Sequence, residues 1–247
     1  MLEPYEPAGG AGPAQGSPGR GLPNWTPETL AAMTVGADRR GWQVEIHAIG
    51  DGGGRAALDA HAAAARANGR RDRRGRLEHI ETIDAADIAR FGREGVVASM
   101  QPFHADPSPN QADVWSANIG KRAERAWVWR SILAGGGLVA FGSDWPVVRF
   151  DPRIHLNMAV NRTTRDGRPP GGWLPEQRLP LSQALAAYTW GSAYAAFGEG
   201  WRGTLEEGKV ADLVVLDRDL LAEGGSAILG TEVRLTVAGG RIVHRTA

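Results

Sequence analysis

The feature that most constrains the fold is a regular alternation of strand-like and helix-like segments over residues 26–144. Each apolar run is short enough for a buried strand, and each is followed by a longer segment with helical start and stop signals. The expected strands are 42–49, 76–81, 96–104 and 138–144, and the expected helices are 26–41, 53–69, 82–95 and 124–136. This alternation predicts a parallel sheet with right-handed helical crossovers.

The second half of the chain has a different pattern. Two longer helices are expected, and three short strands follow them near the end of the chain. A Gly-Gly pair between the last two strands predicts a tight hairpin turn. The helices are expected over 151–164 and 180–198, and the strands over 211–217, 233–240 and 241–245. These strands predict a small antiparallel β module beside the parallel part.

Composition limits the classes of partner. The 247 residues carry 28 basic and 28 acidic side chains, so the formal net charge is zero. Neither nucleic acid nor an anionic membrane surface is an expected partner of such a chain. The sequence has no cysteine, no apolar run long enough to span a membrane and no apolar core of a signal peptide at its start. We therefore expect a cytoplasmic protein without thiol chemistry.

Polar residues stand at or near the carboxyl ends of the expected strands. They are His47, His79, Gln101 and Asp144, each on a different expected strand. Active sites of parallel α/β folds lie at this edge of the sheet. Two imidazoles and a carboxylate can hold a catalytic metal with one position open for water. The alternatives are that each histidine is a satisfied core residue, and that Asp144 is an ordinary turn or helix-cap residue.

Several segments together resemble the amidohydrolase superfamily, and its amidohydrolase-3 or YtcJ-like branch in particular. They are IHAIGDGG, RLEHIE, SMQPFHA, FGSDWPVVRFDP, AVNR and GTLEEGKVADLVVLDRD, in this order along the chain. The resemblance implies the second half of a TIM-type (β/α)8 metallo-dependent hydrolase barrel, followed by a small C-terminal β-sandwich module. The implied divisions are a flexible Gly/Pro-rich segment at 1–24, a partial catalytic barrel at 25–200 and the sandwich module at 201–247.

The resemblance also implies roles for single residues. His47 and His79 correspond to metal ligands, and Asp144 corresponds to an aspartate that contacts the metal and shuttles the proton. The implied reaction is hydrolysis of a non-peptide carbon–nitrogen bond in a small amide-type substrate by water activated on a divalent metal, with zinc expected. Glu45, Glu81 and, less favourably placed, Glu78 are expected acceptors for the second nitrogen of each histidine.

Four further residues have two interpretations each. Gln101 and His104 either act at the substrate or behind the metal ligands, or make loop contacts. Trp145 either lines the substrate pocket or packs against neighbouring residues. Arg162 either binds a substrate carboxylate or has a structural role. His61, His155 and His244 are expected to be structural or solvated.

The sequence departs from the family at its start. The family's first strand carries a His-x-His pair, and none occurs here. The lysines, Lys121 and Lys209, do not lie in the family's lysine context. The chain therefore resembles a C-terminal portion of such an enzyme. The alternatives to an active hydrolase are a catalytically inactive fragment and one chain of a split enzyme, completed by self-association or by a complementary N-terminal chain.

Overall fold

The computed structural model describes residues 1–6, 19–108 and 115–246. The chain divides into two compact units, each described here by itself. Unit 1 comprises Met1–Met100 and Pro107–Val139, and unit 2 comprises Gln101–Asp106 and Ala140–Ala247. Residues 7–18 of the segment predicted to be flexible lie outside the described residues. The predicted domain boundaries at 24 and 200 stay predictions.

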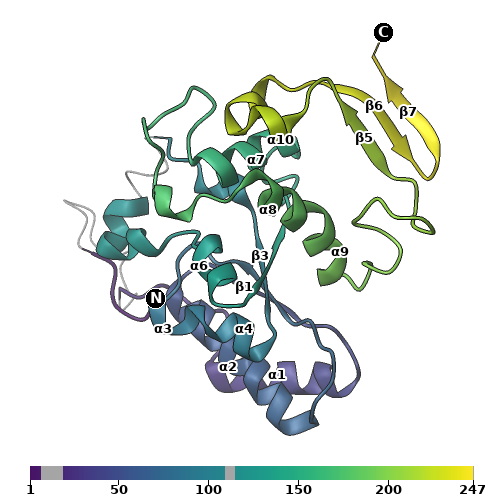
Figure 1. The fold of residues 1–247 in the computed structure, drawn as a ribbon. Helices are drawn as coiled ribbons and strands as arrows, with labels where there is room; N and C mark the ends of the chain where they lie inside the picture. Colours follow the sequence, from purple (N-terminus) through teal and green to yellow (C-terminus); the bar gives the residue numbers. More distant parts are fainter. Residues whose placement is uncertain (7–18, 109–114, 247) are drawn as a thin grey trace. The chain divides into compact units, whose positions relative to one another are not determined.

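A parallel sheet forms the centre of unit 1, as the sequence predicts (Figure 1). Its strands β1 (Glu45–Ala48), β2 (Arg76–His79), β3 (Val97–Met100) and β4 (Leu138–Phe141) lie in the order β1-β2-β3-β4. The register pairs Ile46 with Leu77 and Leu77 with Ala98. The last two residues of β4 already belong to unit 2. The predicted α/β class with a parallel sheet is therefore confirmed.

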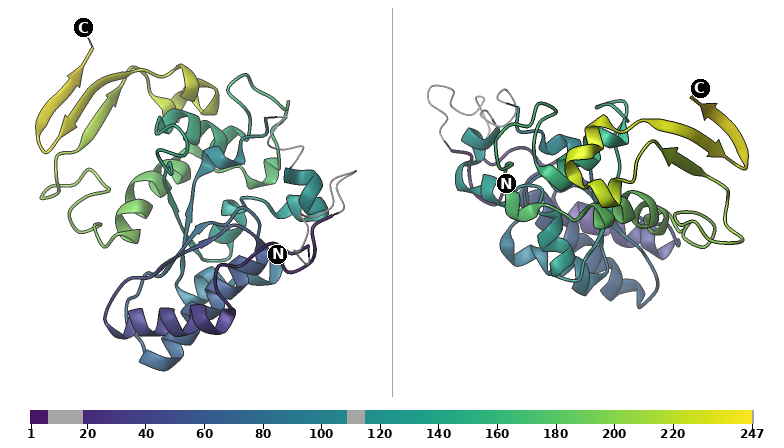
Figure 2. Two further views of the ribbon diagram at one scale, coloured as in Figure 1. Left: turned by 180° about the vertical axis from the view of Figure 1, so that it is seen from behind. Right: turned by 45° about the horizontal axis from the view of Figure 1, so that its top comes forward.

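The helices of unit 1 begin and end largely at the predicted signals. Thr26 caps the first helix by accepting a hydrogen bond from the backbone N–H of Thr29 at 3.2 Å, and Pro27 takes its first position. The first two helices pack along each other (Figure 2). The helix expected over 82–95 is interrupted by a turn at Ala89. The helical elements of unit 1 with described bounds are α1 (Pro27–Arg39), α2 (Asp51–Asn68), α3 (Ala85–Ile88), α4 (Arg90–Glu94), η2 (Gly120–Arg125) and α6 (Trp129–Ala134).

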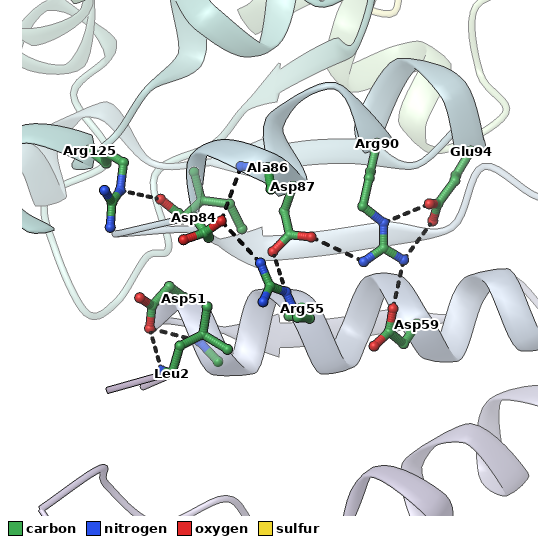
Figure 3. A network of polar contacts seen from close by, with 12 residues as sticks. Leu2, Asp51, Arg55, Asp59, Asp84, Ala86, Asp87, Arg90, Glu94 and Arg125 are labelled. Carbon is green, nitrogen blue, oxygen red and sulfur yellow. Dashed lines mark hydrogen bonds and ion pairs between the residues drawn. The ribbon is translucent and has the colours of Figure 1, made fainter. Parts of the chain in front are cut away.

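A network of ion pairs ties α2 to the two short helices that follow β2 (Figure 3). Asp87, whose side chain is buried, lies 2.9 Å from Arg55 and 3.1 Å from Arg90. Arg90 also contacts Glu94 at 2.7 Å and Asp59 at 2.8 Å. The buried carboxylate is therefore paired from two sides, which its burial requires. This network is therefore part of the scaffold of unit 1.

The expectation that His47 lies in a buried strand is wrong. Ala48 is the one buried residue of β1, and the His47 side chain is exposed. The physical reason is the position of the strand. Within the described residues β1 pairs with β2 alone, so it is an edge of the sheet and its side chains lack a second neighbour.

Unit 2 combines helices with an antiparallel sheet. Its strands β5 (Leu213–Leu216), β6 (Val233–Ala238) and β7 (Arg241–Arg245) pair in the order β5-β6-β7. Gly239 and Gly240 form the predicted hairpin turn at positive φ values of 55° and 76°. The sequence interpretation missed two short helical turns that follow β5. The helical elements are η1 (Pro102–Ala105), α7 (Pro152–Asn161), η3 (Pro175–Gln177), α8 (Leu181–Ala186), the π-helical η4 (Ala187–Gly191), α9 (Ser192–Ala195), α10 (Leu220–Glu223) and η5 (Gly225–Gly230).

None of the helices in the described part of the chain combines the length and the apolar character that a bilayer span requires.

Candidate metal centre

Two of the predicted ligands face each other at the carboxyl ends of neighbouring strands. His47 lies on β1 and His79 is the last residue of β2. Their nitrogens Nδ1 and Nε2 are 2.8 Å apart, and their ring centroids are 4.8 Å apart. The parallel pairing causes this proximity, because it matches Ala48 to His79 and so places His47 one residue away along the edge. The structure thus brings together the two histidines that the sequence selects.

The backbone around His79 and Asp144 adopts a conformation that L-residues rarely take. The φ angles are 76° at His79, 51° at Ile80 and 60° at Asp144. Such left-handed backbone costs free energy for non-glycine residues and is concentrated at functional sites. It turns the chain sharply where β2 ends and just after β4 ends.

In unit 2, Asp144 lies beside a second predicted residue. Nε2 of His104 is 3.5 Å from Oδ2 of Asp144. Two hydroxyl groups hold the segment that leads to Asp144: Ser192 donates to the carbonyl of Phe141 at 2.7 Å, and Tyr188 donates to that of Gly142 at 3.1 Å. The chain is therefore anchored on the two residues that precede the Ser-Asp pair.

The donor atoms of each pair suit a divalent metal. Unit 1 offers the two imidazoles of His47 and His79, and unit 2 offers the imidazole of His104 and the carboxylate of Asp144. Neutral imidazole and carboxylate are the ligands that catalytic zinc sites use. Two nitrogens on one tetrahedral zinc ion lie roughly 3.3 Å apart, so the 2.8 Å spacing of His47 and His79 needs a small separation to fit.

The glutamates expected behind the histidines have other partners. Glu45 forms an ion pair with Arg76, its neighbour across the strands. Glu81 accepts a hydrogen bond from the indole N–H of Trp115 at 3.1 Å, and burial raises its pKa. Neither contact is to a histidine. A role of Glu45 or Glu81 behind the metal ligands stays a prediction.

The other predicted residues fall in distinct surroundings. Gln101 is buried directly after β3, and Trp145 is exposed next to Asp144. Arg162 is wholly buried, donates to the carbonyl of Trp173 at 2.7 Å and packs its guanidinium over that indole ring. Burial lowers the pKa of Arg162 to about 9. These contacts give Arg162 a structural role, and a substrate contact for it stays a prediction.

His104 is a predicted residue whose direction the structure makes specific. Its ring nitrogen lies beside Asp144, the predicted proton carrier, and a role at the substrate or behind the metal ligands stays a prediction. The signal in the sequence is its position three residues after Gln101, at the end of the third strand. The 3-10 turn η1 over Pro102–Ala105 carries it there.

Comparison with known proteins gives a consistent result. The model of the Amidohydrolase family matches residues 1–244. The chain is 37% identical over 229 residues to the protein LONG AFTER FAR-RED 3 of Arabidopsis thaliana, which covers 91% of this chain and 38% of that protein. It is 32% identical over 219 residues to YtcJ of Bacillus subtilis (strain 168), which covers 88% of this chain and 40% of that protein.

A third relative and a solved structure extend this comparison. The N-substituted formamide deformylase of Arthrobacter pascens is 30% identical over 189 residues, 76% of this chain and 34% of that enzyme. The crystal structure of an uncharacterized metal-dependent hydrolase from Pyrococcus furiosus matches with a TM-score of 0.66 at 28% identity, over 81% of this chain and 39% of that chain.

These matches cover most of this chain and a smaller part of each relative. The chain spans 34 to 40% of the length of these three curated relatives. The predicted resemblance to YtcJ-like proteins and the predicted partial metallo-dependent hydrolase fold are both confirmed. The chain belongs to the Amidohydrolase family.

Proposed function

We propose that this chain takes part in hydrolysis of carbon–nitrogen bonds other than peptide bonds, with a divalent metal, zinc above all, as cofactor. The observation that carries the proposal is the facing pair of His47 and His79 at the ends of two parallel strands. The relative named as an N-substituted formamide deformylase supports an amide-type substrate.

The residues of the chain would have separate roles in the reaction. His47 and His79 bind as neutral imidazoles, because a protonated ring nitrogen has no lone pair to offer. When bound, the metal supplies a positive charge that acidifies a water molecule and polarises the carbonyl group. Asp144 would accept a proton from the attacking water on a carboxylate oxygen as the water oxygen bonds to the carbonyl carbon, and would return that proton to the departing nitrogen as the C–N bond breaks. The products are a carboxylic acid and an amine.

His104 would hold the carboxylate of Asp144 in place. Its Nε2 lies 3.5 Å from Oδ2, at the outer limit of a hydrogen bond, and a slightly closer approach would let its N–H orient the carboxylate.

The second interpretation is that the chain is catalytically inactive until another segment completes it. The free edge of β1 favours this interpretation, and so does the span of 34 to 40% of the curated relatives. The completing partner would be a complementary N-terminal chain or a second copy of this one.

Hydrolysis by the zinc-loaded chain tests the first interpretation. Purified chain is incubated with a panel of N-substituted formamides, and formate release is measured for the wild type, for Asp144→Asn and for Asp166→Asn as an exposed control. Release that Asp144→Asn alone abolishes supports the proposal. Equal release by wild type and Asp144→Asn overturns the site assignment. Zinc binding without release by the wild type favours the second interpretation.

A further inference from the structure

Unit 2 contains a cavity that the metal centre does not explain. Its volume is about 610 Å³, within the range of sites for small molecules. All of the lining residues belong to unit 2. Most of the lining comes from the segment that follows Asp144, from Trp145 to Asp151, and the rest from Phe103, Ile154 and Arg165.

The cavity lies beside the pair formed by His104 and Asp144. Phe103 precedes His104 in the chain, Trp145 follows Asp144, and both line the cavity. The two members of the pair are themselves 3.5 Å apart. A molecule whose reacting bond lies at Asp144 can therefore extend its other end into this cavity.

The walls are apolar and exposed. Trp145 is 66% exposed, Val147 71% and Phe150 70%. Trp145 and Phe150 meet edge to face with ring centroids 6.3 Å apart. Large apolar side chains grouped in this way mark binding sites more often than ordinary surface. An aromatic or branched apolar group would cover them and contact both rings.

Buried contacts hold the cavity-lining segment in place. His155 is fully buried on α7, and its Nε2 contacts the backbone carbonyl of Arg149 at 2.8 Å. Its ring packs against those of Phe103 and Tyr188, with centroids 5.7 Å and 6.0 Å away. One end of the apolar wall is thus tied to the helix beneath it, which favours a preformed site.

The charged groups of the cavity leave an excess of positive charge. Asp151, the carboxylate of the lining, is held by Arg153 with contacts of 2.9 and 2.7 Å. Hydrogen bonds from Arg153 lower the pKa of Asp151, so its charge is present and compensated. Arg149 and Arg165 also line the cavity; in the described ranges no ion pair holds either guanidinium, and Arg165 interacts with Asp151 only over a longer distance. A ligand with a negative charge would complement them.

We propose that this cavity binds the non-reacting end of the substrate, and that this end is an aromatic or branched apolar group bearing a carboxylate. Trp145, Val147 and Phe150 contact the apolar part, and Arg149 and Arg165 bind the carboxylate. The assignment of the ligand as substrate rests on the proposed function. The class of ligand rests on the cavity alone.

Binding measured in the absence of metal tests the class of ligand independently of its assignment as substrate. Isothermal titration calorimetry of the whole chain in EDTA at pH 7 compares 3-phenylpropanoate with the neutral 3-phenylpropanamide. We expect the acid to bind at least about tenfold more tightly than the amide, because a charge-assisted contact to arginine is lost in the amide. The double variant Arg149→Gln, Arg165→Gln should remove this preference, and Trp145→Ala should weaken both probes. Arg168→Gln, an exposed arginine paired with Asp166 and absent from the lining, should change neither.

Three outcomes would overturn the proposal: equal affinity for acid and amide, no binding of either probe, or an unchanged preference in the double arginine variant. The folded state of each variant is checked by its unfolding midpoint. Acid-selective binding without formate release in the hydrolysis experiment would leave the ligand class standing and overturn its assignment as substrate.

Discussion

Nδ1 of His47 and Nε2 of His79 lie 2.8 Å apart, although 32 positions separate the two residues in the chain. Only one ring nitrogen of a neutral histidine carries hydrogen, so a direct contact needs one donor and one acceptor. A cation between the two rings would let both nitrogens act as ligands instead. The pair is therefore the natural place to look for bound metal.

We predict that the purified chain, loaded with zinc and dialysed, holds about one zinc ion and that His79→Ala loses it. His79 is buried at a backbone turn with φ of 76°, so no neighbouring side chain can replace its nitrogen easily. Elemental analysis measures the content. His244→Ala is the matched control, because His244 lies on the exposed strand β7. Zinc retained in His79→Ala, or lost equally in His244→Ala, would contradict the assignment.

The exposure of His47 allows function and stability to be separated. We predict that His47→Ala abolishes any formate release and changes the free energy of unfolding by less than about 0.5 kcal/mol, as for other surface substitutions. Urea unfolding and formate release, measured on the same preparation, provide the check. If His47→Ala instead unfolds the chain, its imidazole is structural and the activity loss says nothing about metal.

The sequence predicted the parts of the fold that depend on periodicity and local signals. The order of strands and helices in unit 1 followed from apolar runs, from the cap at Thr26 and from the cap at Asp84, which accepts a hydrogen bond from the N–H of Ala86. The neighbourhood of His47 and His79 followed from their positions at or near the carboxyl ends of two expected strands, although the register pairs His47 with Glu78. In contrast, the exposure of His47 depends on which strands flank β1, and the pairing of Glu45 with Arg76 depends on register. Neither is encoded within a single segment. The same holds for His104, whose turn decides its direction.

Asp38 allows a test of how charge stabilises unit 1. Its side chain is buried, which by itself raises the carboxyl pKa, but hydrogen bonds from Asn68, Arg73 and Arg71 outweigh burial and lower it. A folded-state pKa below the unfolded value means stabilisation that is fully present above about pH 4 and is lost as the pH falls through the folded-state pKa. We predict that Asp38→Asn costs about 2 kcal/mol at pH 7 and progressively less below pH 4.

Urea unfolding at pH 7 and at pH 3 measures this difference. Asp72→Asn is the control, because Asp72 pairs with Arg74 in a largely exposed position and should cost less than about 1 kcal/mol at either pH. A cost of Asp38→Asn that stays the same at both pH values would show that the loss comes from packing and not from charge.

The antiparallel sheet of unit 2 carries apolar side chains in two cross-strand rows. The register places Leu213, Val237 and Ile242 in one row, and Val215, Leu235 and Arg245 in the other. Val215 is exposed, and so is Ile242. The free edge of β1 adds unpaired backbone groups in unit 1. A chain with such surfaces is expected to associate with a copy of itself when no other partner covers them.

We predict that the purified chain is dimeric or larger at micromolar concentration, and that Val215→Lys with Ile242→Lys shifts it toward monomer. Lysines in these two rows would lose their hydration in a contact between copies, so association becomes less favourable. Sedimentation velocity measures the distribution. His244→Lys is the control, since His244 pairs with Thr236 on the opposite side of the sheet and should leave association unchanged. A wild-type chain that sediments as a monomer and unfolds cooperatively would contradict the prediction, because these surfaces would then be exposed without causing association.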